Sequence, residues 1–463
     1  MRGPIWLIAL LTLLQMRASA QAEKIDAYVR SRMAKEHVPG LSVAVVRNGK
    51  LVYADGFGVA NVELNIPATK STVYWLMSVS KQFTAAAVRM LAEEGKIDPD
   101  APCARYLDNA PAAWKGVLVR HLLTHTSGIP DYTDAPGWGQ TLRQDRSPQD
   151  LLAPVMQRSL LFEPGTRWRY SNSNYYLLGL IIERVSGKTW AHFLQQRIFA
   201  PLGMTSTRAN DQSAIIPGRA PGYHWQNGTL HNAPFVSPTQ LWAAGSIIST
   251  VEDLAKWEIA LAAGKLLPRA LTQRMMTPAK LPDGSEAPYG EGNELGRDHG
   301  HRFAGHQGGG LAFNTMLLRY PDDGLSVIVL ANLTQAPSEQ IARKIASYYL
   351  PDLSDDGKPA LADADPQLTL RLKAVVLDAA QGKAEEALFT PQAQQELLPH
   401  LRGAGPRLLP PLGDMKSFTL LERTTDGPLR RYRYRAVYAE GAIYWTFALT
   451  SDSKIADLTP MKE

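Results

Sequence analysis

The segment Leu76–Phe83 reads "LMSVSKQF" and places a serine, Ser78, three residues before a lysine, Lys81. The residues that follow, "QFTAAAVRMLAEEG", are typical of a strong helix and end at Gly95, a residue type that commonly terminates helices. Residues three apart on a helix lie on one face. The sequence therefore predicts that the Lys81 side chain can approach the Ser78 hydroxyl where this helix begins.

The serine–lysine spacing is weak evidence by itself, because it recurs at Ser451 and Lys454 in "LTSDSKIAD", which is typical of a turn between strands. Ser78 instead lies in the apolar stretch "YWLMSVSKQFTAAAV", which indicates burial. Burial and the positive end of a helix both favour a neutral lysine, which can accept the proton of a serine hydroxyl. The alternative is an exposed capping serine beside a solvated lysine.

Two more motifs carry side chains that could act with this pair. Tyr170 and Asn172 lie two apart in "FEPGTRWRYSNSNYYLLG", and in an extended segment such residues point the same way. A tyrosine can relay a proton, and an asparagine can both donate and accept hydrogen bonds. His306 begins "HQGGG", whose glycines Gly308 and Gly309 would let a substrate backbone approach a strand edge. Each motif alone is also compatible with a purely structural role.

The order of the expected elements indicates an α/β (α+β) sandwich. Residues 41–60 and 314–333 each predict two strands around a turn, which in the first pair is Asn48-Gly49. Helical patterns at 23–36 and 338–350 lie outside these strands in the chain, and a long helical region lies between them. We therefore expect one antiparallel sheet flanked by the terminal helices, plus an all-helical subdomain.

The chain begins with a pattern typical of a secretory signal peptide over residues 1–20. Arg2 is followed by an apolar stretch from Ile5 to Leu14 and by Ala18-Ser19-Ala20, a small-residue cleavage site. The apolar stretch is too short to span a bilayer, so we expect no stable membrane span after cleavage. The alternative is a retained N-terminal anchor. Export with the single cysteine Cys103, which cannot form an internal disulfide, fits a periplasmic or secreted bacterial protein.

The C-terminal part of the chain predicts a separate small domain. Residues 351–366 are rich in Asp, Pro and Ala and are typical of a linker, which leaves 21–350 as the main domain. Residues 367–463 begin with helical patterns and continue with several strand patterns, as expected for a small α+β domain. Its segment "RRYRYRAVY" alternates basic and apolar residues, which fits a strand with one wet face.

Composition and charge argue against several other functions. The formal net charge is +5, and removal of residues 1–20, which contain two arginines and no acid, would reduce it to +3. The chain has no long run of Lys and Arg, so we expect no nucleic-acid partner. His121, His125 and Asp131 could suggest a metal site, but the leucine-rich segment around them favours structural roles.

Taken together, "SVSK", "YSN" and "HQG" follow the motif order of the serine β-lactamase and penicillin-binding protein superfamily, and the sequence resembles its class C β-lactamase-like branch. Flanking stretches such as "HLLTHTSGIPDY" and "GHQGGGLAF" are similar as well, over about residues 23–350. That branch includes class C β-lactamases, D-alanyl-D-alanine carboxypeptidases, D-aminopeptidases and carboxylesterases. The C-terminal segment resembles the nuclear-transport-factor-2-like domains found behind some members.

The resemblance implies an exported serine hydrolase that needs no metal or other cofactor. Ser78 would be the acylated nucleophile, Lys81 would accept its proton, and Tyr170 would share the acid–base work. An acyl-enzyme would form and water would release it. The partner is then a substrate, either a small molecule or a peptide.

The remaining motif residues are implied to bind the substrate. Asn172 would orient the lysine and the substrate amide, and His306 and Gly308 would line the strand edge beside the substrate. The backbone N–H groups of Ser78 and Gly309 would form the oxyanion hole.

One position departs from the pattern of the penicillin-hydrolysing members, which often have Lys-Thr-Gly where this sequence has His306-Gln307-Gly308. A lysine there can bind a substrate carboxylate, whereas a histidine is mostly neutral at pH 7. This favours a D-amino-acid peptidase or carboxypeptidase, or a carboxylesterase. A class C-like β-lactamase and a non-catalytic penicillin-binding sensor are the alternatives, although a sensor would not need the serine, lysine and tyrosine together.

Overall fold

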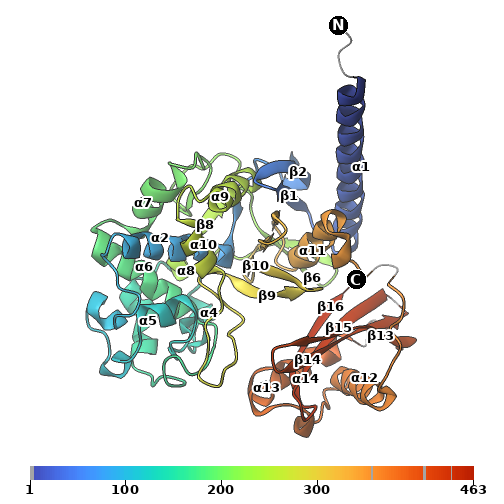
Figure 1. Ribbon diagram of the computed structural model, residues 1–463. Helices are drawn as coiled ribbons and strands as arrows, with labels where there is room; N and C mark the ends of the chain where they lie inside the picture. Colours follow the sequence, from blue (N-terminus) through green and yellow to red (C-terminus); the bar gives the residue numbers. More distant parts are fainter. Residues whose placement is uncertain (1–4, 356–357, 410–412, 440, 463) are drawn as a thin grey trace. The chain divides into compact units, whose positions relative to one another are not determined.

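The computed structural model describes residues 5–355, 358–409, 413–439 and 441–462 (Figure 1). The chain divides into two compact units, residues 1–353 and 354–463. The three motifs all lie in the first unit. The expected linker at 351–366 and the NTF2-like character of the second unit stay predictions.

An antiparallel sheet organises the first unit. Within its described residues seven strands pair in the order β3-β2-β1-β12-β11-β10-β9. The first strand, β1, and the last strand, β12, therefore pair with each other in the middle of the sheet. The β1–β2 turn has φ angles of 49° at Asn48 and 72° at Gly49, the positive values that this type of hairpin requires. The strands are β1 Gly40–Arg47, β2 Lys50–Asn61, β3 Ile66–Pro67, β9 Glu294–Asp298, β10 His301–Gly308, β11 Asn314–Tyr320 and β12 Leu325–Ala331.

Both faces of this sheet are covered, and β1 is therefore buried along almost its whole length. Val43 and Val45 pack in one cluster with residues of α1 (Ile5–Lys35) and α11 (Ser338–Tyr349). Ala44 and Val46, which alternate with them, pack in the cluster formed with the helical subdomain. The predicted α/β sandwich, with terminal helices on one face and helices on the other, is confirmed.

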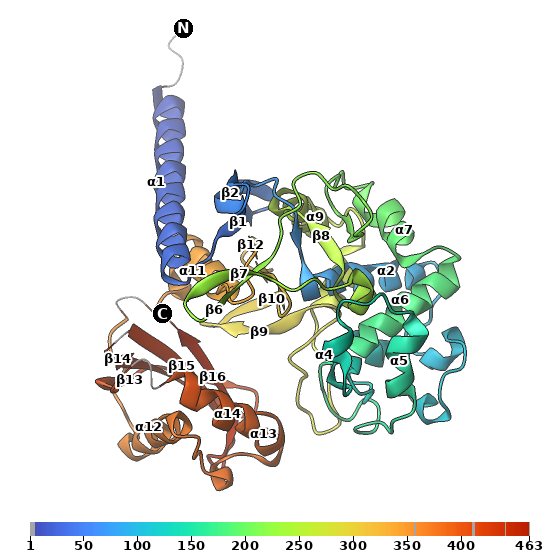
Figure 2. The ribbon, with the colours of Figure 1, turned by 180° about the vertical axis from the view of Figure 1, so that it is seen from behind.

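The helical subdomain is built from the middle of the chain. Figures 1 and 2 show α2, α5, α6 and α7 gathered together, on the opposite side of the unit from β9 and α11. The same part of the chain forms two small sheets, β4–β8–β5 and β6–β7, of which β6–β7 packs in the cluster of α1 and α11. The elements are β4 Tyr74–Trp75, α2 Lys81–Glu93, α3 Val119–Leu123, α4 Trp138–Thr141, α5 Pro148–Met156, α6 Asn172–Ser186, α7 Trp190–Leu194, β5 Arg208–Ala209, β6 Tyr223–Gln226, β7 Thr229–Asn232, α8 Trp242–Gly245, β8 Ile247–Ser249, α9 Val251–Ala263 and α10 Arg269–Met275.

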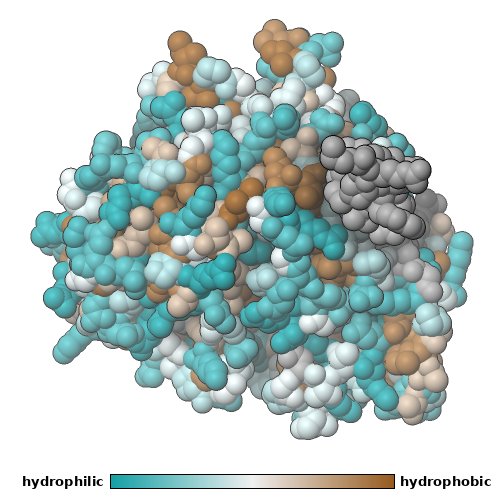
Figure 3. All heavy atoms as spheres, turned by 45° about the horizontal axis from the view of Figure 1, so that its top comes forward, coloured by the Kyte–Doolittle hydropathy of each residue, from teal (hydrophilic) through white to brown (hydrophobic). Residues whose placement is uncertain are grey.

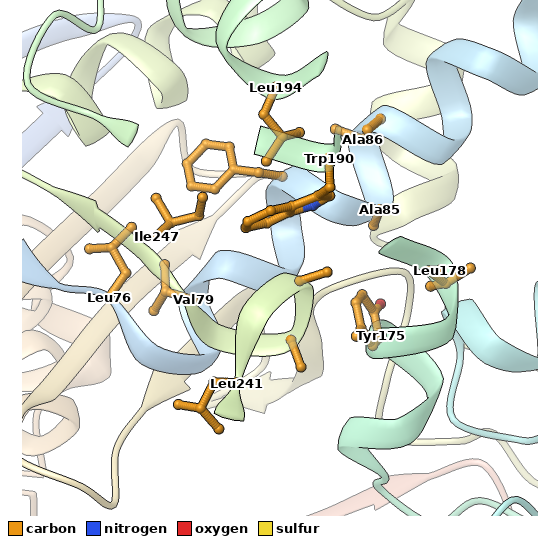
Figure 4. Packing of buried hydrophobic residues seen from close by; sticks show 14 of the residues in the cluster. Leu76, Val79, Ala85, Ala86, Tyr175, Leu178, Trp190, Leu194, Leu241 and Ile247 are labelled. Carbon is orange, nitrogen blue, oxygen red and sulfur yellow. The ribbon is translucent and has the colours of Figure 1, made fainter. Parts of the chain in front are cut away.

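The segment that opened the sequence analysis lies at the centre of this core. Figure 4 shows Leu76 and Val79, on either side of Ser78, beside Ile247, while the indole of Trp190 lies next to Ala86 of α2. All five of these apolar residues are fully buried. Close packing on both sides of Ser78 fixes where the serine backbone lies.

Hydrophilic side chains cover most of the face drawn in Figure 3, and apolar side chains lie on it in separate patches. None of the described helices combines the length with the apolar character that a bilayer crossing requires. α1 runs continuously through the expected cleavage site at residues 18–20, and cleavage there stays a prediction.

The second unit has its own core and its own sheet. Among its described residues, four antiparallel strands pair in chain order and pack against three helices. Lys454, in the turn before the last strand, donates to the carbonyl of Ala387, so the second serine–lysine spacing has a structural use. The elements are α12 Pro366–Ala380, α13 Pro391–Glu396, α14 Leu398–Leu408, β13 Ser417–Asp426, β14 Leu429–Tyr438, β15 Gly441–Leu449 and β16 Ile455–Lys462.

Candidate active site

Ser78 lies in a single 3₁₀ turn, Met77–Ser80, that leads directly into α2. Met77 before it has a φ of 53°, a strained value for a residue with a side chain, and strain of this kind often occurs at functional sites. The turn packs against the end of β10, where a Cβ at Gly308 would come within 2.2 Å of the Leu76 carbonyl oxygen. Thr315 of β11 also donates to that oxygen, at 2.8 Å. Glycine at 308 therefore permits the contact that holds the serine turn.

Lys81 is fully buried, and its amino group touches three polar atoms. Nζ lies 3.1 Å from Ser78 Oγ, 2.9 Å from Asn172 Oδ1 and 2.6 Å from the carbonyl oxygen of Ala244 in α8. A neutral amine has two N–H groups and one lone pair. The two carbonyl oxygens can take only the N–H groups, which leaves the lone pair for the serine hydroxyl.

The electrostatic surroundings favour that neutral form. Burial lowers the pKa of Lys81 to about 7, and the nearby carboxylates of Asp131 and Glu294 oppose this shift only in part. A substantial fraction of the amine is therefore neutral at pH 7. The structure thus brings the buried amine of Lys81 within hydrogen-bond distance of the Ser78 hydroxyl. This geometry suits proton transfer from serine to lysine.

Tyr170 completes the immediate surroundings of the serine. Its hydroxyl donates to Ser78 Oγ at 3.0 Å, and its ring lies 4.9 Å from Lys81 Nζ. Burial raises the pKa of Tyr170 far above its usual value, so it stays a phenol at all physiological pH values. Tyr170 can thus donate a proton near the serine, and phenolate chemistry is disfavoured.

Asn172 is held in one orientation by Asp131. Its backbone N–H and its side-chain Nδ2 both donate to Asp131 Oδ2, at 2.8 and 3.0 Å, so Oδ1 is the atom that faces Lys81. Asp131 is buried and also accepts from the N–H of Thr133. Sequence reasoning assigned Asp131 a structural role, and no local pattern around it indicates that it reaches the first residue of α6.

His125 fixes the chain on both sides of Tyr170. Its carbonyl accepts the N–H of Arg169, its ring Nδ1 accepts the N–H of Ser171, and its ring centre lies 4.4 Å from that of Tyr170. The ring is fully buried, and burial lowers the pKa of His125 well below its usual value. A neutral His125 is therefore part of what positions the tyrosine.

His306 lies in β10 with its ring centre 6.0 Å from that of Tyr170, but its side chain is buried. It is 1% exposed, its Nδ1 donates to the carbonyl of Gln307 at 2.6 Å, and its Nε2 accepts from the hydroxyl of Tyr289 at 2.8 Å. Burial lowers the pKa of His306 to about 3, so the ring is neutral. Both ring nitrogens are already occupied by protein groups, and contact between this ring and a substrate would require one of these bonds to break.

The edge of β10 next to His306 is open to a substrate strand. β9 pairs with β10 only as far as Gly305 opposite Glu294, so no described strand covers the last residues of β10 on that side. Gly309 follows directly and is exposed. Glu294 Oε1 lies 3.4 Å from His306 Nδ1, and its side chain is 42% exposed. Loss of water around its carboxyl group, and then the negative charge of Glu339, raise the pKa of Glu294 to about 8.

Comparison with known proteins places this site in a family. A family model described as β-lactamase matches residues 25–349. The chain belongs to the β-lactamase family. It is 30% identical over 341 residues to a penicillin-binding protein of Bacillus subtilis (strain 168), an alignment that covers 69% of this chain and 74% of that protein.

Two further relatives of this β-lactamase-family chain have names that mention D-amino acids. A D-aminopeptidase of Brucella anthropi is 30% identical over 351 residues, which cover 73% of this chain and 65% of the relative's length. The crystal structure of a D-amino acid amidase from Ochrobactrum anthropi SV3, complexed with L-phenylalanine, matches with a TM-score of 0.61 and 25% identity, over 73% of this chain and 99% of that one. This protein is therefore a serine hydrolase of the β-lactamase and penicillin-binding protein family.

The pKa of Lys81 leads to a prediction about pH. We expect kcat/KM for a neutral ester to rise about tenfold per pH unit well below pH 7 and to level off near pH 8, because only the neutral amine can accept the serine proton. Asp131→Asn removes a charge that raises the pKa of Lys81, so the variant should reach its plateau at lower pH. Stopped assays of ester hydrolysis across pH 5–8.5 measure the pH profiles of the unmodified protein and of the variant.

Asp134→Asn is the matched control, since this nearby carboxylate is exposed and contacts only Arg169 among the ion pairs described. It should leave the pH at half-maximal activity unchanged. A flat profile between pH 6 and 8 in the unmodified protein, or an unshifted profile in Asp131→Asn, would contradict the assignment of Lys81 as the titrating base.

Proposed function

We propose that the protein cleaves the amide bond of D-amino-acid amides or short peptides that have a free amino group, through an acyl-enzyme on Ser78. The observation that carries the proposal is the buried Lys81 amine, whose three contacts match a neutral base with its lone pair on the serine hydroxyl. The D-amino-acid preference is supported by the names of the relatives. The chain spans 65% of the length of the D-aminopeptidase, so that activity is proposed here.

The proposed reaction has two half-reactions. Ser78 Oγ attacks the substrate carbonyl carbon while Lys81 Nζ takes the hydroxyl proton, and the carbonyl oxygen becomes an oxyanion. The N–H groups of Ser78 and Gly309 would bind that oxyanion. Tyr170 gives its proton to the leaving nitrogen and regains one from the Lys81 ammonium. Water then attacks the acyl-serine with the same groups acting in reverse, which releases the acid and restores the free serine.

The charges around the strand edge support a substrate without a carboxylate at that end. His306 is neutral and buried where a lysine would be a cation, and the partly exposed side chain beside it is the acid Glu294. An approaching ammonium group lowers the pKa of a carboxyl group and ionises it. Glu294 can thus pair with the free amine of a D-aminoacyl substrate. A carboxypeptidase or a β-lactamase would instead bind a substrate carboxylate, which this arrangement disfavours.

The test of the chemistry compares the protein with its Ser78→Ala variant on four substrates. These are a D-phenylalanine nitroanilide, a D-alanyl-D-alanine peptide, a nitrophenyl ester and a cephalosporin. We expect the free-amine anilide to have the highest kcat/KM of the amide substrates and Ser78→Ala to lose at least 10³-fold activity. Mass spectrometry should find an acyl adduct on the Ser78 peptide of the unmodified protein alone.

Absence of any turnover or adduct in the unmodified protein would overturn the hydrolase mechanism proposed for Ser78. Fast turnover of the cephalosporin or of the carboxylate-ended peptide, with slow turnover of the anilide, would overturn the substrate class. Turnover of the ester alone would assign the protein to the carboxylesterases.

The role of Glu294 is tested separately with an isosteric change. Glu294→Gln should raise KM for the free-amine anilide about tenfold and leave KM for its N-acetylated form unchanged, because only the first carries an ammonium group. Glu286→Gln is the control, because this exposed acid is not among the charges that shift the pKa of Glu294. Equal effects of Glu294→Gln on both anilides would contradict ammonium binding.

We also propose that the protein is exported and acts in the periplasm or outside the cell. Arg2, the apolar stretch Ile5–Leu14 and the small residues at 18–20 support this. The mature N-terminus, read by mass spectrometry from bacterial cell fractions, should begin just after residue 20. A chain that keeps residues 1–20 in the cytoplasmic fraction would contradict the proposal.

A further inference from the structure

One cavity in the first unit is lined by residues that belong to none of the three motifs. Its volume is about 950 Å³, and its walls come from α3 and the loop after it, the loop around Gly165, the end of α10 with residues 277–282, and Glu291. Cavities that hold small organic ligands typically have this size. None of the residues that we assign to the hydrolase site lines it.

The charged side chains that line this cavity are mostly cations. Arg120, Arg274 and Lys280 contribute positive charge, and Glu291 is the carboxylate among the lining residues. Glu291 is already engaged by the buried guanidinium of Arg89 through two hydrogen bonds, which leaves it little capacity to neutralise the cavity. Arg274 Nε lies 3.8 Å from Glu291 and is 55% exposed. Arg120 pairs with Asp100, so Arg274 and Lys280 carry the positive charge that is available to a ligand.

His121 supplies a fixed hydrogen-bond donor in the wall. Its ring is 9% exposed, and its Nδ1 accepts the N–H of Leu118 at 3.2 Å, so the proton of the neutral ring is on Nε2. Burial lowers the pKa of His121 to about 4, which keeps the ring neutral. Among the described residues no hydrogen bond to Nε2 is found, and the neighbouring residue of the wall is Gly165.

Gly165 leaves that N–H uncovered. A Cβ at this position would lie 3.2 Å from His121 Nε2, and the φ of 84° is one that favours glycine. Much of the remaining wall is formed by four threonines and five apolar residues: Thr124, Thr126, Thr166, Thr277, Pro164, Leu271, Pro278, Leu281 and Pro282. The cavity combines one buried N–H donor, the two cations Arg274 and Lys280, and apolar surface.

We propose that this cavity binds a small organic acid, with its carboxylate or phosphate held by His121, Arg274 and Lys280 and its apolar part against the prolines and leucines. An N–H donor and two cations match the lone pairs of an oxyanion. The cavity is too large for a bare inorganic ion, and the apolar wall accounts for the remaining volume. The proposal concerns a second binding site and does not depend on which substrate Ser78 attacks.

The test uses the full chain and three aromatic probes of similar shape: benzoate, phenyl phosphate and neutral benzamide. We expect calorimetry or ligand-observed NMR to detect one or both acids and to find benzamide at least tenfold weaker. His121→Asn keeps an acceptor near the Leu118 N–H but is too short to donate into the cavity, and Lys280→Gln removes an exposed cation. Each should weaken binding of the acid by about three- to tenfold.

Lys265→Gln is the matched control, because this exposed lysine lines none of the cavities described, and it should bind the acids normally. Ester hydrolysis and the thermal midpoint of Lys280→Gln should both equal those of the unmodified protein, which separates this site from the hydrolase site. Tighter binding of phenyl phosphate identifies phosphate as the preferred group, and tighter binding of benzoate identifies carboxylate. Failure of both acids to bind at about 10 mM, or equal binding by both variants and the control, would overturn the proposal.

Discussion

The burial of one lysine amine sets the main constraint on this structure. Lys81 Nζ has no exposed surface, so its partners must all come from the protein, and they come from separate parts of the chain: the turn of Ser78, the start of α6 and the end of α8. These elements must meet within hydrogen-bond distance. A Cβ at Gly179 of α6 would come within 2.5 Å of Ala243 Cβ in α8, so the close approach of these two helices depends on glycine at this point.

The surroundings of the lysine balance two opposing effects on its pKa. Removal from water favours the neutral amine, while the carboxylates of Asp131 and Glu294 favour the ammonium ion. Desolvation is the larger effect, and the result is a pKa near 7 instead of one far below it. Such a base is partly neutral at working pH yet still basic enough to take a proton from serine. Asp131 has a further use, because it also orients the amide that accepts from the lysine.

Much of the fold and the central pair could be predicted from local patterns. The hairpin at Asn48-Gly49 and the helix after Ser78 each depend on residues close together in the chain, and the structure contains both. One contact at a helix start could not be predicted: the hydroxyl of Ser338, the first residue of α11, donates to the carbonyl of Asn314 in β11. That carbonyl is 24 residues away, which no local pattern indicates.

The residues that support the site could not be predicted for the same reason. Asp131 meets Asn172, and His125 meets Ser171, across more than 40 residues, and only the packing of α3 and its loop against α6 brings them together. The histidine of the third motif is the clearest case. Its sequence position fits the strand edge, but the direction of its side chain depends on which face of β10 is covered, and that face holds Tyr289.

The burial of His306 changes how charge can be recognised next to the serine. A lysine at the third motif keeps its charge and must reach toward solvent, whereas a neutral imidazole can be buried at little electrostatic cost and bonded on both nitrogens. The histidine thereby stiffens the strand edge through Tyr289 and Gln307 and leaves charge recognition to another side chain. Glu294, at the point where β9 stops pairing with β10, is the ionisable group that remains partly exposed there. Under the proposed substrate class, a neutral ring beside an acid replaces one cation and would reverse the sign of the charge that the site prefers, while the serine, lysine and tyrosine would serve the same acyl-transfer chemistry.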